Sequence, residues 1–166
     1  MENYRTFLPR VIAVIIDSLV FLPLAIINYP ISGLELPPSI FYLWFLIMNL
    51  AHPFYTVLMH GYYGQTLGKM VLKVKVVDLQ ENPITFNQAV VRSLPEIIFN
   101  SSVVFIAMSQ TGTDNASFLP VSSVAAALTI LSIIWGIADI AVFVLNEKNC
   151  ALHEFIAGTV VVKSNP

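Results

Sequence analysis

The chain has 166 residues, of which 57% are hydrophobic and only 11% are charged, whereas soluble domains carry roughly 25% charged residues. Its mean hydropathy of +0.78 indicates a membrane protein, because so much apolar surface does not fit inside the core of one small soluble domain. The net charge of −2 and the lack of a dense basic cluster argue against a nucleic-acid-binding protein.

Four apolar stretches are long enough to span a bilayer, which takes about 20 residues. They are residues 9–29, 40–60, 87–108 and 121–145. The first begins like a signal peptide, but no small-residue cleavage site follows it, so we expect a span that is retained. The third carries Arg92, Glu96 and Asn100 at four-residue spacing and is the least apolar. The sequence therefore predicts an all-α membrane protein, with four transmembrane helices in a single domain of residues 1–166.

Two segments outside the spans predict a small cytoplasmic β-element. Residues 71–77 alternate between apolar side chains and lysines, a period of two that is typical of a half-buried strand. Residues 159–162 read Thr-Val-Val-Val and predict a second strand. Because a lone strand is not stable, we expect the two to pair with each other. The pairing would bring the corner at His153 and Glu154 under the first and third spans, near Arg10.

The positive charges indicate how the chain is oriented in the membrane. The eight lysines and arginines are Arg5, Arg10, Lys69, Lys73, Lys75, Arg92, Lys148 and Lys163. All of them lie before the first span, between the second and third spans or at the start of the third, or after the fourth. The positive-inside rule then predicts a multi-pass protein of the cell (plasma or inner) membrane, with both termini and residues 61–86 in the cytoplasm.

Three carboxylates on three different spans are expected at one depth, roughly 9–14 Å from the cytoplasmic boundary at 1.5 Å per residue. They are Asp17, Glu96 and Asp139. An ionised carboxylate in hydrocarbon costs at least about 2.5–3.5 kcal/mol, so each needs a partner, water or a proton. We expect Asp17 to pair with Arg92, while Arg10 extends to the cytoplasmic surface. Three acids then face one deep arginine, so at least one acid is neutral or holds a cation or water.

Each acid has a structural interpretation beside the functional one. Asp17 is either a proton or cation site or a charge pair that fixes helix packing. Glu96 lies four residues after Arg92, a spacing that predicts an ion pair within one helix. Asp139 has no basic neighbour on its own helix and is the best candidate for an acid that titrates.

Motifs for a metal, a cofactor or an enzymatic reaction are missing from the sequence. The segment H-E-F-I-A lacks the second histidine of the zinc-protease motif, and G-Q-T-L-G-K-M lacks the first glycine and the Ser/Thr of a phosphate loop. His52 and His60 have no further ligands at suitable spacing for a metal ion. We therefore expect a protein that is not an enzyme and has no metal or cofactor.

Several segments together resemble the RDD family of small bacterial membrane proteins. They are Arg10 with Asp17, the run G-Q-T-L-G-K-M-V-L-K-V-K-V-V-D, the following A-V-V-R, and the terminal L-H-E-F-I-A-G-T-V-V-V. The family is named for one arginine and two aspartates, and Arg10 and Asp17 match the first two. Glu154 stands where the family usually has the third acid after a histidine, and Asp139 is the rival assignment. The resemblance covers nearly the whole chain and implies transport, with sodium–proton exchange in some members.

Two functions stay open from the sequence. In the first, the protein transports ions in the lipid bilayer: one carboxylate among Asp17, Glu96 and Asp139 takes up a proton in exchange for a monovalent cation, Na⁺ or K⁺. Because four helices pack without leaving a lumen, we expect the pathway between protomers of a homo-oligomer. In the second, the charges fix helix pairing and the cytoplasmic face binds a partner, so that the protein is a non-transporting scaffold or accessory subunit.

Overall fold

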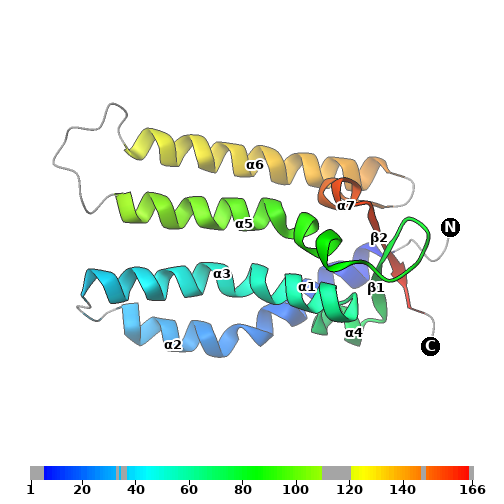
Figure 1. The fold of residues 1–166 in the computed structure, drawn as a ribbon, viewed down its shortest axis with the longest axis horizontal. Helices are drawn as coiled ribbons and strands as arrows, with labels where there is room; N and C mark the ends of the chain where they lie inside the picture. The colour runs from blue at the N-terminus through cyan, green and yellow to red at the C-terminus, as the bar shows by residue number, and fades with distance from the viewer. Residues whose placement is uncertain (1–5, 33, 35–36, 110–120, 147–148, 165–166) are drawn as a thin grey trace.

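The structure, a computed structural model, describes residues 6–32, 34, 37–109, 121–146 and 149–164. These residues form mostly helices, with one small sheet (Figure 1). In chain order the elements are α1 (Phe7–Val20), α2 (Leu22–Ser32), α3 (Pro38–Tyr63), α4 (Leu67–Val71), β1 (Val74–Asp78), α5 (Phe86–Ser109), α6 (Val121–Leu145), α7 (Leu152–Ala157) and β2 (Thr159–Lys163).

The long helices run side by side, and the short elements gather at one end of them (Figure 1). Helix α3 packs most extensively on α5, and α5 also contacts α6 and α7. The first turn of α1 lies at the same end as α4, α7, β1 and β2, whereas the C-terminal ends of α2 and α5 lie at the opposite end (Figure 1). We call α4, α7, β1 and β2 together the end module.

The first predicted span is not one straight helix. It consists of α1 and α2, which meet at Phe21 with a bend of 46°. Pro23 explains the break, because a proline has no N–H to donate to the carbonyl of Leu19 and its ring collides with that carbonyl. The amide of Phe21 instead bonds the carbonyl of Ser18 at 3.2 Å, which closes α1 with a tight turn.

Among the described residues, two helical stretches are long and apolar enough to cross a membrane: Ser39–Tyr63 and Ser123–Leu145. A third is added if the bent pair Phe7–Val20 and Leu22–Ile31 counts as one span. Helix α5 lies where the third span is predicted, but it does not meet this test. Its polar residues, among them Arg92 and Glu96, lower its hydropathy. The helices are therefore present as predicted, and two or three of them have the character of spans.

The outer face of α6 is apolar, as expected for a surface in contact with lipid. Ile130, Ile133, Ile134 and Ile137 each leave more than half of their surface exposed. Exposing such an apolar surface to water is energetically unfavourable, whereas contact with the hydrocarbon of a bilayer is not. Together with the length and hydropathy of the helices, it identifies a membrane protein.

The two predicted strands pair with each other, which confirms that expectation. β1 and β2 are antiparallel, with Val76 opposite Val161 and Lys75 opposite Val162. Val76 and Val161 are fully buried and pack in a small core that includes Ile84. The sheet is thus half-buried, as the alternation of valine and lysine predicts.

The first strand begins later than predicted, at Val74 instead of residue 71. A short helix occupies the residues before it, because Thr66 caps α4 and residues 67–71 form one helical turn. Lys73 then adopts a left-handed conformation with φ of 53° and turns the chain into β1. Five helical residues are too few to leave a periodic pattern in the sequence, so only the capping threonine could have indicated α4.

Candidate functional site

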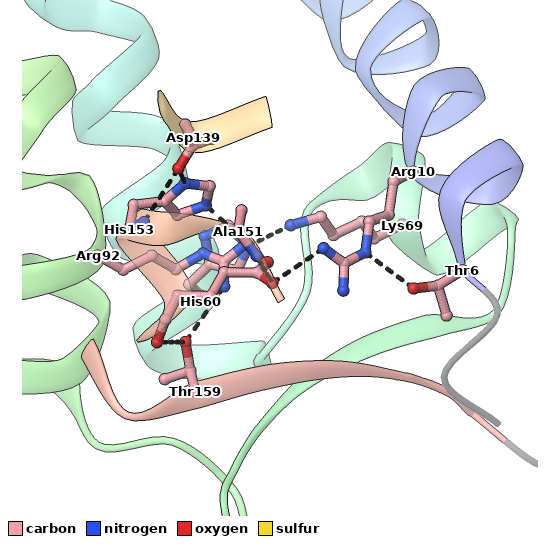
Figure 2. Close-up of polar contacts among 10 residues, drawn as sticks. Thr6, Arg10, His60, Lys69, Arg92, Asp139, Ala151, His153 and Thr159 are labelled. Carbon is pink, nitrogen blue, oxygen red and sulfur yellow. Dashed lines mark hydrogen bonds and ion pairs between the residues drawn. The ribbon is translucent and has the colours of Figure 1, made fainter. Parts of the chain in front are cut away.

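Glu154 is the centre of the polar site. It is 1% exposed and lies on α7, where its two oxygens face two different arginines. Oε2 accepts a hydrogen bond from Arg10 Nη1 at 2.9 Å, and Oε1 accepts one from Arg92 Nη2 at 2.7 Å. The amide of Ala151 also donates to Oε2, at 3.2 Å. Figure 2 shows Arg10 and Arg92 approaching from opposite sides, from α1 and α5.

The two arginines keep Glu154 ionised. Burial by itself raises the pKa of a carboxyl group, but here the charges of Arg92 and Arg10 outweigh burial and lower the pKa of Glu154 to about 2. The carboxylate therefore does not take up a proton near neutral pH. Glu154 therefore joins α1, α5 and α7 through ion pairs.

Arg10 is not on the cytoplasmic surface, so that prediction is wrong. Its side chain is only 13% exposed, because the end module covers it. Besides Glu154, Arg10 contacts Thr6 Oγ1 through Nε at 2.9 Å, and its guanidinium lies 5.2 Å from the ring centre of Phe143. The expectation that the His153–Glu154 corner lies near Arg10 is confirmed.

Asp17 does not pair with Arg92, which corrects a second expectation. Its buried carboxylate instead accepts three hydrogen bonds from the segment that precedes β1 and from α3. The donors are Thr66 Oγ1 at 2.6 Å, the Gly68 amide at 2.8 Å and Tyr55 Oη at 2.9 Å. Asp17 thus holds the N-terminus of α4 against α1, where helix amides lack partners within their own helix.

Gly68 allows α4 to approach α1 closely. A Cβ atom at this position would collide with the carbonyl oxygen of Ala13 on α1. Only glycine therefore fits between the two backbones at the distance that the Asp17 contacts require.

Glu96 and Asp139 each contact a histidine. Glu96 Oε1 contacts His52 Nδ1 on α3 and not Arg92, so the predicted pair within α5 is wrong. Asp139 Oδ1 accepts from the amide of His153 at 3.0 Å and lies 2.8 Å from its Nδ1. Asp139 has no basic neighbour on its own helix, as noted from the sequence, but α7 supplies one.

Asp17, Glu96 and Asp139 therefore do not share one site. Each lies on a different helix, and each has its own protein partners. The expectation that three acids share one deep arginine left out Arg10, Glu154 and the histidines as partners. Among the described residues, no three His, Cys, Asp or Glu side chains lie close enough together to bind a metal ion.

A cavity of about 350 Å³ lies beside Glu154. Its size is within the range of small-molecule sites, roughly 300–1,000 Å³. Seven ionisable side chains line it, together with Trp135 and other residues: Arg10, His60, Lys69, Arg92, Glu96, His153 and Glu154. Three of these are Lys or Arg and two are acids, so the lining is more basic than acidic.

Lys69 is the unusual member of this lining. Its Nζ lies 2.9 Å from His60 Nε2, a basic nitrogen, and among the described residues it makes no ion pair with a carboxylate. Burial lowers the pKa of Lys69 well below its ordinary value, and the charge of Arg92 lowers it further. Figure 2 shows the amine of Lys69 directed toward His60, next to Arg10. Lys69 and His60 can therefore share a proton, but two full charges at this distance repel each other.

A model of the RDD family matches residues 4–158. The chain belongs to the RDD family. Neither the curated proteins nor the solved structures gave a match to it. The match covers the whole site described above, from Arg10 to Glu154.

The two acids considered for the third position that names the RDD family have different partners in the structure. Glu154 is the acid that contacts Arg10, whereas Asp139 contacts His153. In this RDD protein Arg10 and Glu154 thus form one buried ion pair, and Asp17 lies at a separate contact with α4. The extra methylene of Glu154, compared with aspartate, does not prevent contact with both arginines.

Sequence reasoning missed Tyr55, Thr66, His60 and Lys69 in the site. Thr66 carried a readable signal, since a threonine before a short helical run is a typical N-cap. Lys69 was counted only as a cytoplasmic charge. Nothing in the sequence indicates that Tyr55 and His60 face the site, because the rotation of α3 about its axis depends on its packing against α5.

Proposed function

We propose that this RDD protein couples the movement of an ion across the membrane to the movement of a proton. The observation that carries the proposal is the cavity of about 350 Å³ lined by seven ionisable side chains. Ionisable groups are expensive inside a membrane and typically mark ion or proton pathways. A histidine ring nitrogen can take up and release a proton, and His60 and His153 both line the cavity.

The proposal changes which residues handle the proton. The sequence predicted a proton on Asp17, Glu96 or Asp139 in exchange for a monovalent cation such as Na⁺ or K⁺. Asp17 is occupied by three donors and lies outside the cavity lining. Glu96 and His153 line the cavity, and each can share a proton with its partner, His52 or Asp139.

We further propose four transmembrane spans, with α1 and α2 as one bent span and α5 as another. The distribution of lysine and arginine supports cytoplasmic termini and a cytoplasmic end module. The polar start of α5 then lies at the interface, and its apolar remainder crosses the membrane. A pathway between protomers of a homo-oligomer agrees with the close packing of α3 on α5.

Flux measurements on proteoliposomes test the proposal. The protein is reconstituted with a pH-sensitive dye inside, and gradients of Na⁺, K⁺ or sulfate are imposed in turn. We expect a gradient-dependent pH change that Glu96→Gln removes, since Gln cannot take up a proton from His52. Glu81→Gln, at an exposed site in the turn before α5, is the matched control and should leave the flux unchanged. If the wild-type protein produced no pH change in any of these gradients, transport would be contradicted.

The second candidate function is a non-transporting scaffold or accessory subunit. The observation that favours it is that Asp17, Asp139 and Glu154 all hold parts of the end module against the long helices. In that case Glu96→Gln and the wild-type protein should behave identically in flux and in assembly. The scaffold function would be supported by two results together. The wild-type protein would show no flux, and a substitution in the end module would release a bound partner protein.

A further inference from the structure

The charge balance of the cavity bears on which ion it takes. Arg10 and Arg92 are neutralised in part by Glu154, which they share. Glu96, the other acid in the lining, contacts His52. Protonation of Lys69 adds a positive charge that no carboxylate of the described residues pairs with. When Lys69 is charged, a cation in this cavity would meet net repulsion, whereas an anion would meet attraction.

We propose that the cavity binds a small oxyanion, such as sulfate or a phosphate group, through Lys69 in its charged form. The inference names the ligand class of the cavity, and it rests on the proposed function for its role in the cell. It departs from the monovalent cation that the sequence suggested, because the carboxylates expected to bind a cation are taken by protein donors.

Lys69 has the contacts that such a site requires. Among the described residues, the polar partner of its Nζ is the His60 ring nitrogen, at 2.9 Å. An amine offers three N–H donors when charged, and oxyanions accept such charge-assisted bonds at about 2.7–2.9 Å. A bound oxyanion would thus replace the missing counter-charge of Lys69, and the buried amine would take up a proton at the same time.

The binding of the anion is therefore linked to pH. The groups that face Lys69 are Arg10 and Asp17 from α1, His60 from α3, Arg92 from α5 and Glu154 from α7. Burial and the charge of Arg92 lower the pKa of Lys69 well below its ordinary value, so the neutral amine is favoured over a wider pH range than in a free lysine. Because the anion binds the charged amine, its affinity should rise as the pH falls toward that pKa. This coupling would carry a proton together with the anion.

The test is direct binding of sulfate to the full chain in an uncharged detergent. Sulfate is fully ionised over the useful pH range, so any pH dependence belongs to the protein. Trp135 lines the cavity, and a Trp44→Phe background leaves it as the single tryptophan of the chain. We expect a saturable change in Trp135 fluorescence, with calorimetry as a second measurement, and tighter binding at lower pH.

Three variants make the test specific. Lys69→Gln should weaken sulfate binding by roughly tenfold or more, because a charge-assisted bond contributes about 1.5–3 kcal/mol. Lys73→Gln, at an exposed lysine nearby, should bind as the wild type does. Lys69→Arg should retain binding but lose its pH dependence, since arginine stays charged throughout. A pH dependence that persists in Lys69→Arg would overturn the role assigned to Lys69.

Short-chain phosphatidylglycerol, added in place of sulfate, distinguishes the source of the oxyanion. Binding of sulfate or inorganic phosphate assigns a free anion, and lipid binding that Lys69→Gln weakens assigns a lipid headgroup. If sulfate, inorganic phosphate and phosphatidylglycerol all fail to bind, the inference is overturned. Binding without flux in liposomes would contradict only the proposed function, whereas Na⁺ or K⁺ flux without oxyanion binding would contradict only this inference.

Discussion

Single charged side chains join parts of this protein that lie far apart in the sequence. The ion pair of Arg10 with Glu154 spans a separation of 144 residues, and that of Arg92 with Glu154 spans 62. Removing one partner of a buried ion pair costs about 3–5 kcal/mol, because it leaves the other charge unpaired. Glu154 is therefore the single position at which a substitution should affect α1, α5 and α7 at once.

The pKa of Glu154 predicts how stability depends on pH. Its value of about 2 in the folded protein lies below the ordinary 4.5, so the ion pairs stabilise the fold fully above pH 4.5. That stabilisation, roughly 3 kcal/mol, is lost as the pH falls from 4.5 toward 2. Thermal unfolding of the wild type in detergent should show this loss. Glu154→Gln should be less stable at pH 7 and should lack this component of the acid dependence; equal acid profiles would contradict the prediction.

The sequence identified most of the important charged residues but few of their partners. Arg10, Asp17 and Glu154 stand out because a charge in or beside an apolar run needs an explanation. Their pairing does not follow from the sequence, because it depends on the rotation of each helix and on where α7 folds back. The assumption that Arg10 extends to water failed for this reason, since Glu154 covers it from the other end of the chain.

At the scale of elements, two long helices hold two short helices in the same way. Asp17 of α1 accepts from the amide of Gly68, and Asp139 of α6 accepts from the amide of His153. Both amides belong to the second residue of a short helix, α4 or α7. The free N–H groups at a helix N-terminus attract a carboxylate. Neither short helix would be stable alone in water, so these contacts order the end module.

The contact between α1 and α4 can be tested with a pair of glycine substitutions. Gly68→Ala should destabilise the protein by at least about 1–3 kcal/mol, because the added methyl group collides with the backbone of Ala13. Gly136→Ala on α6 is the control, since its added atom meets nothing within 4 Å. Thermal unfolding in detergent measures both. If the two variants were equally stable, the close approach of α4 to α1 would be wrong.

The elements themselves were largely predictable, and the exceptions have local causes. The long helices and both strands lie within a few residues of the predicted ranges, because apolar runs and alternation are strong patterns. Helix α4 was missed because one turn leaves no periodic pattern. The bend between α1 and α2 was missed although Pro23 was visible, because a proline inside an apolar run predicts either a kink or a break.

At the scale of the whole molecule, the proposed topology makes a sharp prediction about α5. A helix that carries Arg92 and Glu96 either crosses the membrane or lies along its surface, and the two cases place Ser123 on opposite sides. We predict that α5 crosses. The charged residues lie within its first three turns, and its remaining residues are mostly apolar.

Labelling of single cysteines with a membrane-impermeant maleimide checks this topology. In a Cys150→Ala background, Leu34→Cys and Ser123→Cys should react in intact cells. Gln80→Cys should react only after the cells are permeabilised. The Cys150→Ala protein alone should not react, as the chain then has no cysteine. Reaction of Ser123→Cys only after permeabilisation would mean that α5 does not cross the membrane.

The way Glu154 is shared limits the conformations that the protein populates. Both of its oxygens are occupied, one by a guanidinium from α1 and the other by one from α5. Moving α1 away from α5 must break one of these contacts, at about 3–5 kcal/mol. Such a difference keeps the separated form at roughly one molecule in a hundred to one in several thousand. Separation of α1 from α5 is accordingly rare, and an external anion that pairs with the released guanidinium would make it more common.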